Sequence, residues 1–228
     1  GVVGESGAGK SLTGASIIGL LEPPGRVASG EILLQGKRID NLPNDQMRKV
    51  RGRQIGAIFQ DPLTSLNPLY SVGRQLIETI TTHLPVSQAE ARQRAIDLLK
   101  DTGIPAAEQR IDHYPHQFSG GMRQRVVIAL ALAAEPRLIV ADEPTTALDV
   151  SIQAQIITLL KTICKQRGAA VMLITHDMGV IAETCDRVAV LYAGRVAEIG
   201  PVHNVINKPS HPYTSGLMAS IPDMAVDR

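Results

Sequence analysis

The sequence predicts an α/β protein with a mainly parallel sheet. Three observations favour this class. Compact apolar runs at residues 55–59, 138–141 and 169–174 are bounded by polar or helix-breaking residues, as strands buried on both faces are. Apolar residues at helical spacing fill intervening segments such as 150–166. A glycine-rich motif joins the apolar residues 2–3 to a helical segment, which is typical of a strand–loop–helix unit.

The composition fits one globular domain with a subdomain. The chain has 228 residues, of which 44% are hydrophobic, enough for a substantial core. Its formal net charge of +1 lacks the basic excess of a nucleic-acid-binding protein. The longest apolar run, residues 126–134, reaches about half of the roughly 20 residues that a membrane-spanning helix needs. We therefore expect no membrane span and no nucleic-acid partner.

Two cysteines, Cys164 and Cys185, lack the spacing of a metal site or a redox motif. We expect free thiols in a reducing compartment, with a disulfide or a metal ligand as the alternative. No secretory signal pattern is visible. The chain begins with Gly1, only three residues before the glycine-rich motif, so we expect it to be a fragment of a longer gene product.

The glycine-rich motif is the central functional signal. It matches the pattern G-x-x-x-x-G-K-[ST] and consists of Gly4, Glu5, Ser6, Gly7, Ala8, Gly9, Lys10 and Ser11. Such a loop wraps backbone N–H groups around a phosphate, and the helix expected at 12–21 directs its positive dipole end at the anion. Lys10 can reach the β- and γ-phosphates of a nucleotide, and the Ser11 hydroxyl can bind Mg²⁺. The motif predicts a nucleotide site, with a chance glycine-rich turn as the alternative.

Two hairpins and a short helix are expected in the remainder of the α/β part. Residues 29–40 alternate about a Gln35-Gly36 turn, and residues 188–199 do so about Ala193-Gly194, as antiparallel hairpins do. Residues 44–53 are polar and basic, which predicts a short helix with a solvated face.

The part of the chain after residue 60 is predicted to be mostly helical. A turn-rich stretch at 63–73 precedes helical segments at 74–83 and 87–102. The spacing Ser87-x-x-Glu90 is that of a capping box at the start of the second helix.

Polar residues follow three of the predicted strands. They are Gln60 after 55–59, Asp142 and Glu143 after 138–141, and His176 after 169–174. Ligands of open α/β sheets bind at the carboxyl ends of strands, so we expect the two acids near the phosphates. There Asp142 can hold Mg²⁺ through water, and Glu143 can take a proton from an attacking water. The residues alone favour a surface role for Gln60 and a structural role for His176, although its place at this edge makes a functional role more attractive.

Ser119, Gly120 and Gly121 precede an apolar helical segment at 122–134. A serine and two glycines at a helix entrance form either an ordinary N-cap or a second anion site. Both interpretations stay open at this point.

Taken together, these motifs resemble the ATP-binding subunit of ABC transporters over essentially the whole chain. In that family residues 4–11 correspond to Walker A, Gln60 to the Q-loop glutamine, Ser119-Gly120-Gly121 to the signature, Asp142-Glu143 to Walker B, Asp149 to the D-loop and His176 to the switch histidine. The resemblance implies a P-loop NTPase fold with a RecA-like parallel core and antiparallel hairpins, formed by residues 1–60 and 135–228. Residues 61–134 would form a helical subdomain that includes the signature. The resemblance also assigns functional roles to Gln60 and His176.

Four longer strings are similar to importers of the oligopeptide, dipeptide and nickel group: FQDPLTSLNP, YPHQFSGGMRQR, DEPTTALDV and KPSHPYT. The resemblance implies an ATP-hydrolysing subunit that powers uptake of peptides or a related small solute through a separate membrane permease. A peptide, a nickel complex and glutathione all stay open as cargo. The alternative is a soluble ABC-type ATPase that acts on ribosomes or nucleic acid.

The resemblance further implies ATP and Mg²⁺ as cofactors and assigns a role to each site residue. Glu143 would be the general base, His176 would hold the γ-phosphate and the water, and Lys10 would offset phosphate charge. Ser11, Gln60 and, through water, Asp142 would hold Mg²⁺, and nucleotide contacts would extend to Leu12. Two subunits, identical or related, would face each other head to tail, so that Ser119, Gly120, Gly121 and Asp149 act in trans.

The implied partners are integral membrane permease subunits and, indirectly, an extracytoplasmic substrate-binding protein. The implied location is peripheral, at the cytoplasmic face of the inner (plasma) membrane. The chain departs from the family pattern at Phe118, where Leu is usual, and at Met122, where Gln is commonest. It also lacks the adenine-stacking aromatic residue that family members carry ahead of the phosphate loop, and the cysteine-rich stretch that often follows HPYT.

Overall fold

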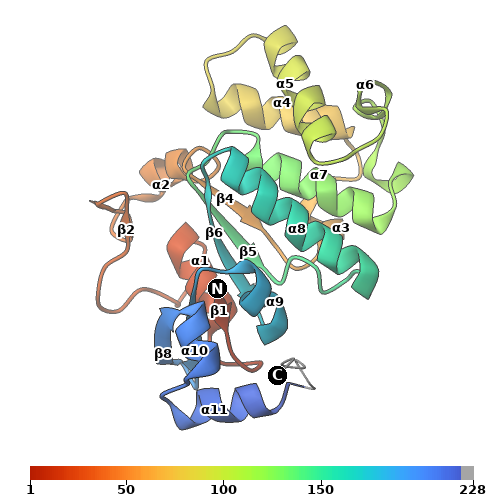
Figure 1. The fold of residues 1–228 in the computed structure, drawn as a ribbon. Coiled ribbons are helices and arrows are strands. Elements are labelled where there is room, and N and C mark those ends of the chain that lie inside the picture. The colour runs from red at the N-terminus through yellow and green to blue at the C-terminus, as the bar shows by residue number, and fades with distance from the viewer. Residues whose placement is uncertain (222–228) are drawn as a thin grey trace. The chain divides into compact units, whose positions relative to one another are not determined.

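The structure is a computed structural model that describes residues 1–221 (Figure 1). The chain divides into two compact units. The first consists of Gly1–Arg26 and Met172–Arg228, described as far as residue 221, and the second of Val27–Val171. The predicted division into a core of residues 1–60 and 135–228 and a helical subdomain of residues 61–134 stays a prediction.

The first unit is built on a short sheet whose inner strand is buried. Its elements are β1 (Val2–Val3), α1 (Lys10–Ile18), the end of β6 (Ala170–Thr175), α9 (Met178–Thr184), β7 (Arg187–Tyr192), β8 (Arg195–Pro201), α10 (Val202–Asn207) and α11 (Pro212–Ala219). Strand β1 lies between β6 and β7 and is parallel to both, with Val2 opposite Ile174 and Ala189. Val3 and Ile174 are fully buried because this sheet is covered on both faces.

The sheet of the first unit ends in the predicted antiparallel hairpin. Strands β7 and β8 pair from Arg187 to Pro201, and the turn residues Ala193 and Gly194 both have positive φ, 48° and 76°. Two successive left-handed residues form the turn that matches the twist of hairpin strands. This hairpin prediction is confirmed.

The second unit carries most of the helices. Its elements are β2 (Leu33–Leu34), β3 (Lys37–Arg38), α2 (Asn44–Val50), β4 (Ile55–Ile58), α3 (Pro62–Ser65), α4 (Val72–His83), α5 (Gln88–Asp101), α6 (Ala107–Arg110), the 3₁₀ helix η1 (Pro115–Gln117), α7 (Gly120–Leu132), β5 (Leu138–Asp142) and α8 (Val150–Gln166). Strands β2 and β3 form the predicted hairpin about Gln35 and Gly36, which have φ of 50° and 78°. Strands β4 and β5 are parallel, with Ile55 opposite Leu138.

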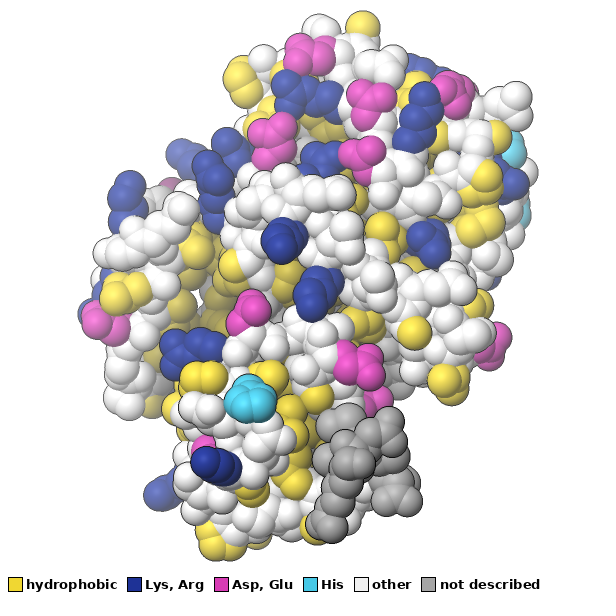
Figure 2. Space-filling view, viewed as in Figure 1, with side chains coloured by type: hydrophobic (Ala, Val, Ile, Leu, Met, Phe, Trp, Pro, Cys, Tyr) yellow, Lys and Arg dark blue, Asp and Glu magenta, His cyan; other side chains and the backbone are white. Residues whose placement is uncertain are grey.

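Helices α4, α5 and α6 gather in the upper part of Figure 1. Their fully buried side chains include Leu76, Ile80, Leu99 and Ile111, which supply an apolar core. The outer surface is polar, and Figure 2 shows acidic and basic side chains interspersed over these helices. Several of them form ion pairs: Arg92–Asp112 at 2.9 Å, Arg94–Glu90 at 2.9 Å, and Lys100–Glu108.

The boundaries of two helices differ from the prediction. Helix α1 ends at Ile18 and does not reach residue 21, because Gly19 adopts φ 69° and its N–H caps the carbonyls of Ala15 and Ser16. Helix α2 ends at Val50, and Gly52 with φ 86° then turns the chain into β4. In both places a glycine with positive φ follows a helix that is shorter than predicted, from apolar residues for α1 and from polar residues for α2.

Two predictions in the helical part are corrected. The stretch 63–73 is not all loop, because Asp61 caps the short helix α3 by accepting the Leu63 N–H at 2.8 Å. At the start of α5, Ser87 accepts the Glu90 N–H at 3.1 Å, which is half of the expected capping box. The Glu90 carboxylate turns instead to Arg94. Within residues 1–221, no helix combines the length and apolar character that a bilayer crossing needs.

Candidate functional site

The glycine-rich loop of the first unit has the backbone geometry of a phosphate cradle. Gly7 and Gly9 have φ of 81° and 98°, a region that side chains disfavour. Gly4 has another reason to lack a side chain, since a Cβ there would lie 2.4 Å from the carbonyl oxygen of Leu191. The loop leads directly into α1, whose N-terminus can bind an anion.

Lys10 is held over this loop. Its side chain is only 8% exposed, and Nζ donates hydrogen bonds to the carbonyl oxygens of Gly4 (2.7 Å) and Glu5 (2.9 Å). The backbone N–H of Ala8 also donates to Glu5, at 3.1 Å. A buried ammonium group beside a turn of backbone N–H groups suits a phosphate.

The first unit brings His176 to the same sheet edge as the cradle. Val3 at the end of β1 lies opposite Thr175 at the end of β6, so Gly4 and His176 are the next residues along two paired parallel strands. The His176 side chain is exposed. Asp177, the next residue, caps α9 by accepting the N–H groups of Gly179 (2.9 Å) and Val180 (3.2 Å). These hydrogen bonds fix the turn between β6 and α9.

The second unit brings Gln60 to the same sheet edge as the two acids. Ile58 lies opposite Ala141 in the parallel pair, so the chain reaches Gln60 and Glu143 at equal distance beyond the paired residues. Asp142 is the last residue of β5. The structure thus places His176 and the cradle at the strand ends of the first unit, and Gln60, Asp142 and Glu143 at the strand ends of the second unit.

Glu143 has an unusual backbone. Its φ is 46°, and such values are uncommon for a residue with a side chain and cluster at functional sites. The Thr146 hydroxyl donates to Glu143 Oε2 at 3.1 Å. The carboxylate is therefore oriented by its own loop, which sequence reasoning did not foresee.

Ser119 begins α7 as an N-cap, because its Oγ accepts the Met122 N–H at 3.3 Å. Ser119 and Gly120 are exposed, whereas Gly121 is buried and a Cβ there would lie 3.1 Å from Ile152 Cγ2. Phe118 is 3% exposed, so this apolar replacement for Leu is accommodated in the core. The N-cap interpretation is confirmed, and the anion-binding role stays a prediction.

Asp149 occupies the N-cap position of α8 and is exposed. Among the described residues, its carboxylate makes no side-chain capping hydrogen bond. An aspartate at this position normally accepts an N–H of the first turn. The Asp149 carboxylate is therefore not committed to its own helix.

The side chains at these positions have the chemistry that ATP and Mg²⁺ require. Magnesium prefers hard oxygen ligands and usually keeps several waters while it binds phosphates and one or two carboxylates. Ser11 offers an exposed hydroxyl, Gln60 an amide oxygen and Asp142 a carboxylate. These donor types suit Mg²⁺, and their binding of one ion together stays a prediction.

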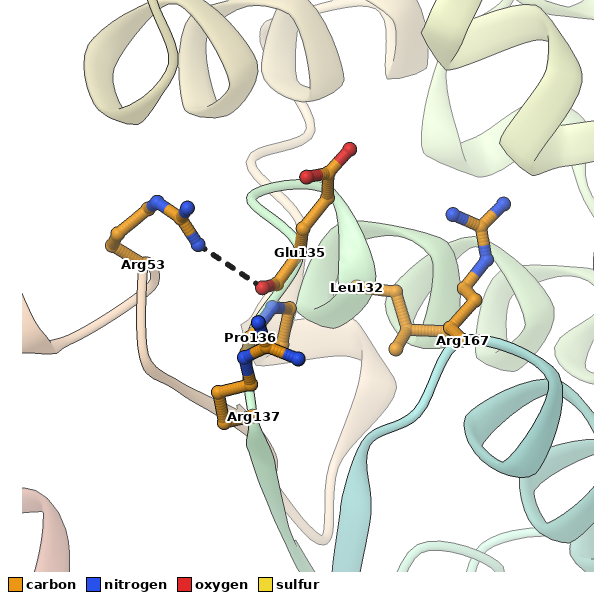
Figure 3. Close-up of a pocket in the computed structure, with 6 residues that line it drawn as sticks. All are labelled: Arg53, Leu132, Glu135, Pro136, Arg137 and Arg167. Atoms are coloured by element: carbon orange, nitrogen blue, oxygen red, sulfur yellow. Dashed lines mark hydrogen bonds between the residues drawn. The ribbon is translucent and has the colours of Figure 1, made fainter. Parts of the chain in front are cut away.

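A cavity of about 270 Å³ in the second unit is a different feature (Figure 3). It is lined by Arg53, Leu132, Glu135, Pro136, Arg137 and Arg167. Arg53 donates to the carbonyl oxygens of Ala134 (3.2 Å) and Glu135 (3.1 Å) beyond the end of α7, and Arg167 pairs with Asp101 at 2.7 Å. Two of the arginines that line the cavity therefore already have partners: Arg53 binds the carbonyl oxygens after α7, and Arg167 forms an ion pair. None of the predicted site residues lines this cavity.

The sequence did not predict three hydrogen bonds around the candidate site: Thr146 to Glu143, Tyr213 to Glu5, and Gln124 to Pro144. The only sequence signal for Tyr213 was the string KPSHPYT, which indicates a family without indicating a contact. No spacing rule connects Tyr213 with Glu5 or Gln124 with Pro144, because these residues lie far apart in the chain.

Comparison with known proteins agrees with these motifs. Residues 1–146 match the family model "ABC transporter", and residues 197–228 match "Oligopeptide/dipeptide transporter, C-terminal region". The oligopeptide transport ATP-binding protein OppD of Bacillus subtilis is 53% identical over 98% of this chain and 63% of its own length. The dipeptide transport ATP-binding protein DppD of Escherichia coli is 48% identical over 100% of this chain and 70% of its own length. The chain thus spans about two thirds of the length of these curated relatives.

Solved structures give the same answer for the fold. The dimeric ATP-binding cassette MJ0796 bound to ADP and Pi matches with a TM-score of 0.75 at 32% identity, over 88% of this chain and 84% of the other. The protein cbiO1 from Clostridium perfringens, part of the ABC transporter complex cbiONQ, matches with a TM-score of 0.77 at 32% identity, over 91% and 78%. The predicted P-loop NTPase class is confirmed. The chain therefore belongs to the ABC transporter family, as an ATP-binding domain followed by the C-terminal region of oligopeptide and dipeptide transporters.

Proposed function

We propose that this chain is the ATP-hydrolysing subunit of an ABC importer that powers uptake of peptides or a related small solute through a separate permease. The observation that carries the proposal is the glycine cradle with buried Lys10 in a chain that also matches the C-terminal region of peptide transporters. The named relatives are oligopeptide and dipeptide transport ATP-binding proteins, which supports the cargo class.

Phosphoryl transfer from ATP to water depends mainly on positioning and charge stabilisation. Lys10 and the N–H groups of the cradle offset the charge that develops on the β- and γ-phosphates. Residues 5–9 and Leu12, exposed at the start of α1, complete the contacts of the cradle with the nucleotide.

Glu143 takes the proton of the attacking water as general base. Its positive φ and the hydrogen bond from Thr146 support this role, because both orient the carboxylate. His176, exposed at the sheet edge beside the cradle, holds the γ-phosphate and the water.

Magnesium, when bound, neutralises phosphate charge and orients the γ-phosphate for attack. Ser11, Gln60 and, through water, Asp142 hold the ion.

A second subunit completes the site. Ser119, Gly120, Gly121 and Asp149 of one subunit close over the ATP held by the other, and the pair is a homodimer or a heterodimer with a related ATP-binding subunit. The exposure of Ser119, Gly120 and Asp149 supports this arrangement. The solved cassette bound to ADP and Pi is dimeric, which also supports it.

The segment after Gln60 contacts the permease. Two large apolar side chains are exposed there, Leu63 (63%) and Leu69 (78%), and Phe59 (46%) is exposed just before Gln60. Apolar groups exposed together commonly belong to an interface. Closure of the subunit pair would then move the permease, while an extracytoplasmic substrate-binding protein delivers the cargo. The chain lies at the cytoplasmic face of the inner (plasma) membrane as a peripheral subunit.

The alternative of a soluble ABC-type ATPase that acts on ribosomes or nucleic acid has less support. The relatives quoted above are named as transport proteins. The net charge of +1 does not favour a polyanionic partner.

The test is ATPase activity of this subunit reconstituted with its permease in vesicles, with one ligand-loaded binding protein added at a time. We expect a peptide-loaded binding protein to stimulate hydrolysis. Stimulation by a nickel complex or glutathione instead would change the cargo, and co-sedimentation with ribosomes without any stimulation would overturn the importer assignment.

A further inference from the structure

Both backbone polar groups of Glu5 in the cradle form hydrogen bonds. Its N–H donates a hydrogen bond of 3.2 Å to the hydroxyl oxygen of Tyr213. Its carbonyl oxygen accepts from Lys10 Nζ at 2.9 Å and from the Ala8 N–H at 3.1 Å. Because the N–H and the C=O of Glu5 are both engaged, the orientation of this part of the loop is determined. One of the three partners comes from the far end of the chain.

Tyr213 is itself fixed by the hairpin of the first unit. Its ring lies against the ring of Tyr192, with centroids 4.5 Å apart and planes inclined by 35°. Tyr192 is the last residue of β7, and the turn that follows it donates the Gly194 N–H to the carbonyl oxygen of Ala8 at 3.1 Å. The hairpin therefore touches the cradle directly at Ala8 and supports Tyr213 at Glu5.

The segment that carries Tyr213 is anchored on Glu198 of β8. Glu198 Oε1 accepts the Ser210 N–H at 2.9 Å, and Oε2 accepts the His211 N–H at 3.1 Å. Burial raises the pKa of Glu198, but these hydrogen bonds, together with the Thr214 side chain and the nearby His211, outweigh it and leave the pKa below its ordinary value. His211 Nδ1 then accepts the Tyr213 N–H at 3.1 Å and caps α11.

These contacts give a physical role to the string KPSHPYT. Glu198 holds its middle, His211 begins α11, and Tyr213 reaches the phosphate loop. If the segment only packed α11 on the hairpin, the ring of Tyr213 would be sufficient and its hydroxyl would not be needed. The hydroxyl is the part that contacts Glu5.

We infer that Tyr213 is a positioning residue for the phosphate loop, through which the C-terminal region sets the affinity of the cradle for nucleotide phosphates. It acts through the Glu5 peptide and does not touch the nucleotide. Without the hydroxyl, the Glu5 N–H loses its partner in the chain and the cradle samples more orientations, so binding has to order it. The inference rests on the proposed function, because it assumes that the cradle binds ATP.

The test compares Tyr213→Phe with Tyr192→Phe. The first removes only the hydroxyl that accepts from Glu5, and the second removes a hydroxyl from the other ring of the same pair. A net hydrogen bond corresponds to about two- to tenfold in an equilibrium constant. We expect Tyr213→Phe to weaken binding of a non-hydrolysable ATP analogue by about two- to tenfold, while Tyr192→Phe binds like the wild type. Amide hydrogen exchange should become faster at Glu5 in Tyr213→Phe alone.

A second variant tests the anchor without changing the tyrosine. Glu198→Gln replaces one carboxylate acceptor by an amide nitrogen, which cannot accept the N–H of residue 210 or 211. We expect weaker binding of the analogue and faster exchange at Glu5 here as well, with a cooperative unfolding transition retained.

The outcomes separate this inference from the proposed function. Equal affinity and equal Glu5 exchange in the wild type and in Tyr213→Phe would overturn the positioning role and leave the ATPase assignment intact. A wild-type chain that failed to bind the analogue would overturn both.

Discussion

The side-chain amide of Gln124 donates a hydrogen bond of 2.5 Å to the carbonyl oxygen of Pro144. Gln124 lies in α7, the helix that Ser119 begins, and its side chain is 0% exposed. Pro144 directly follows Glu143, the predicted base. The helix that starts at the signature and the loop that carries the base are therefore joined by a buried contact within the second unit.

Gln124→Leu should lower both stability and turnover. The change leaves the Pro144 carbonyl without its buried partner, which costs about 1–3 kcal/mol, and it loosens the loop at Glu143. Denaturant unfolding and kcat check the two effects. Gln93→Leu, on the exposed surface of α5, serves as the control and should change stability by less than about 0.5 kcal/mol. Unchanged kcat in a destabilised Gln124→Leu variant would show that the contact has a structural role alone.

Glu143→Gln should abolish turnover and retain ATP binding. The amide keeps the size and the hydrogen-bonding reach of the side chain but cannot take a proton, and the loss of a general base costs about 10²- to 10⁴-fold. Single-turnover hydrolysis and analogue binding separate the two properties, with Glu135→Gln as the matched control. Normal hydrolysis in Glu143→Gln would refute its assignment as base.

Gly4→Ala and Gly7→Ala should both weaken binding of the ATP analogue, but for different reasons. A Cβ at Gly4 meets the Leu191 carbonyl oxygen at 2.4 Å, so the loop has to move away from β7. Gly7 has open space around it but φ of 81°, so alanine there costs only the left-handed conformation, about 1–2 kcal/mol.

Gly168→Ala is the control for this pair, because Gly168 has φ of 68° and open space but lies at the end of α8. It should lower stability as Gly7→Ala does and leave binding of the ATP analogue unchanged. Loss of binding should be larger in Gly4→Ala than in Gly7→Ala. The reverse order would mean that the approach of the loop to Leu191 does not limit binding.

Asp40→Asn should weaken the β2–β3 hairpin in a pH-dependent manner. Hydrogen bonds from Arg38 and from the Ile32 N–H lower the pKa of Asp40 to about 2. Because the folded value lies below the unfolded value of about 4, the ionised carboxylate stabilises the fold above pH 4, and this contribution is lost as the pH falls towards 2. Unfolding curves should show the variant less stable than the wild type at pH 7, with the difference disappearing between about pH 4 and 2. Asp186→Asn, at an exposed position, should show no such convergence.

The two free cysteines should differ in reactivity. Cys164 is 1% exposed, and burial raises the pKa of its thiol to about 11, so little thiolate forms at neutral pH. Cys185 is half-buried and lies 3.6 Å from the Thr184 hydroxyl. A maleimide at pH 7.5 should label Cys185 in the folded chain and Cys164 only after denaturation, as peptide mass spectrometry would show. Labelling of Cys164 at the same rate in the folded Cys185→Ser variant would contradict its burial.

The sequence by itself predicted the strands and the cradle, whereas the site residues stay a prediction. Apolar runs bounded by breakers predict buried strands because only such segments can be covered on both faces. The cradle is readable because glycine is needed wherever φ is positive, as at Gly7 and Gly9. Gln60 and His176 could be assigned only through family resemblance, because a single polar residue after a strand carries no chemistry of its own.

Only the tertiary structure decided which residues meet and which conformations they adopt. Parallel register brings His176 to the strand end next to that of Gly4, and Glu143 to the strand end next to that of Gln60, and register depends on strand pairs that are far apart in the chain. The positive φ of Glu143 has no signal in the sequence, because side-chain residues adopt it only when surrounding contacts enforce it. The contact between Glu5 and Tyr213 is of the same kind: local rules reach a few residues along the chain, whereas these two groups meet only because the hairpin brings the end of the chain back to its beginning.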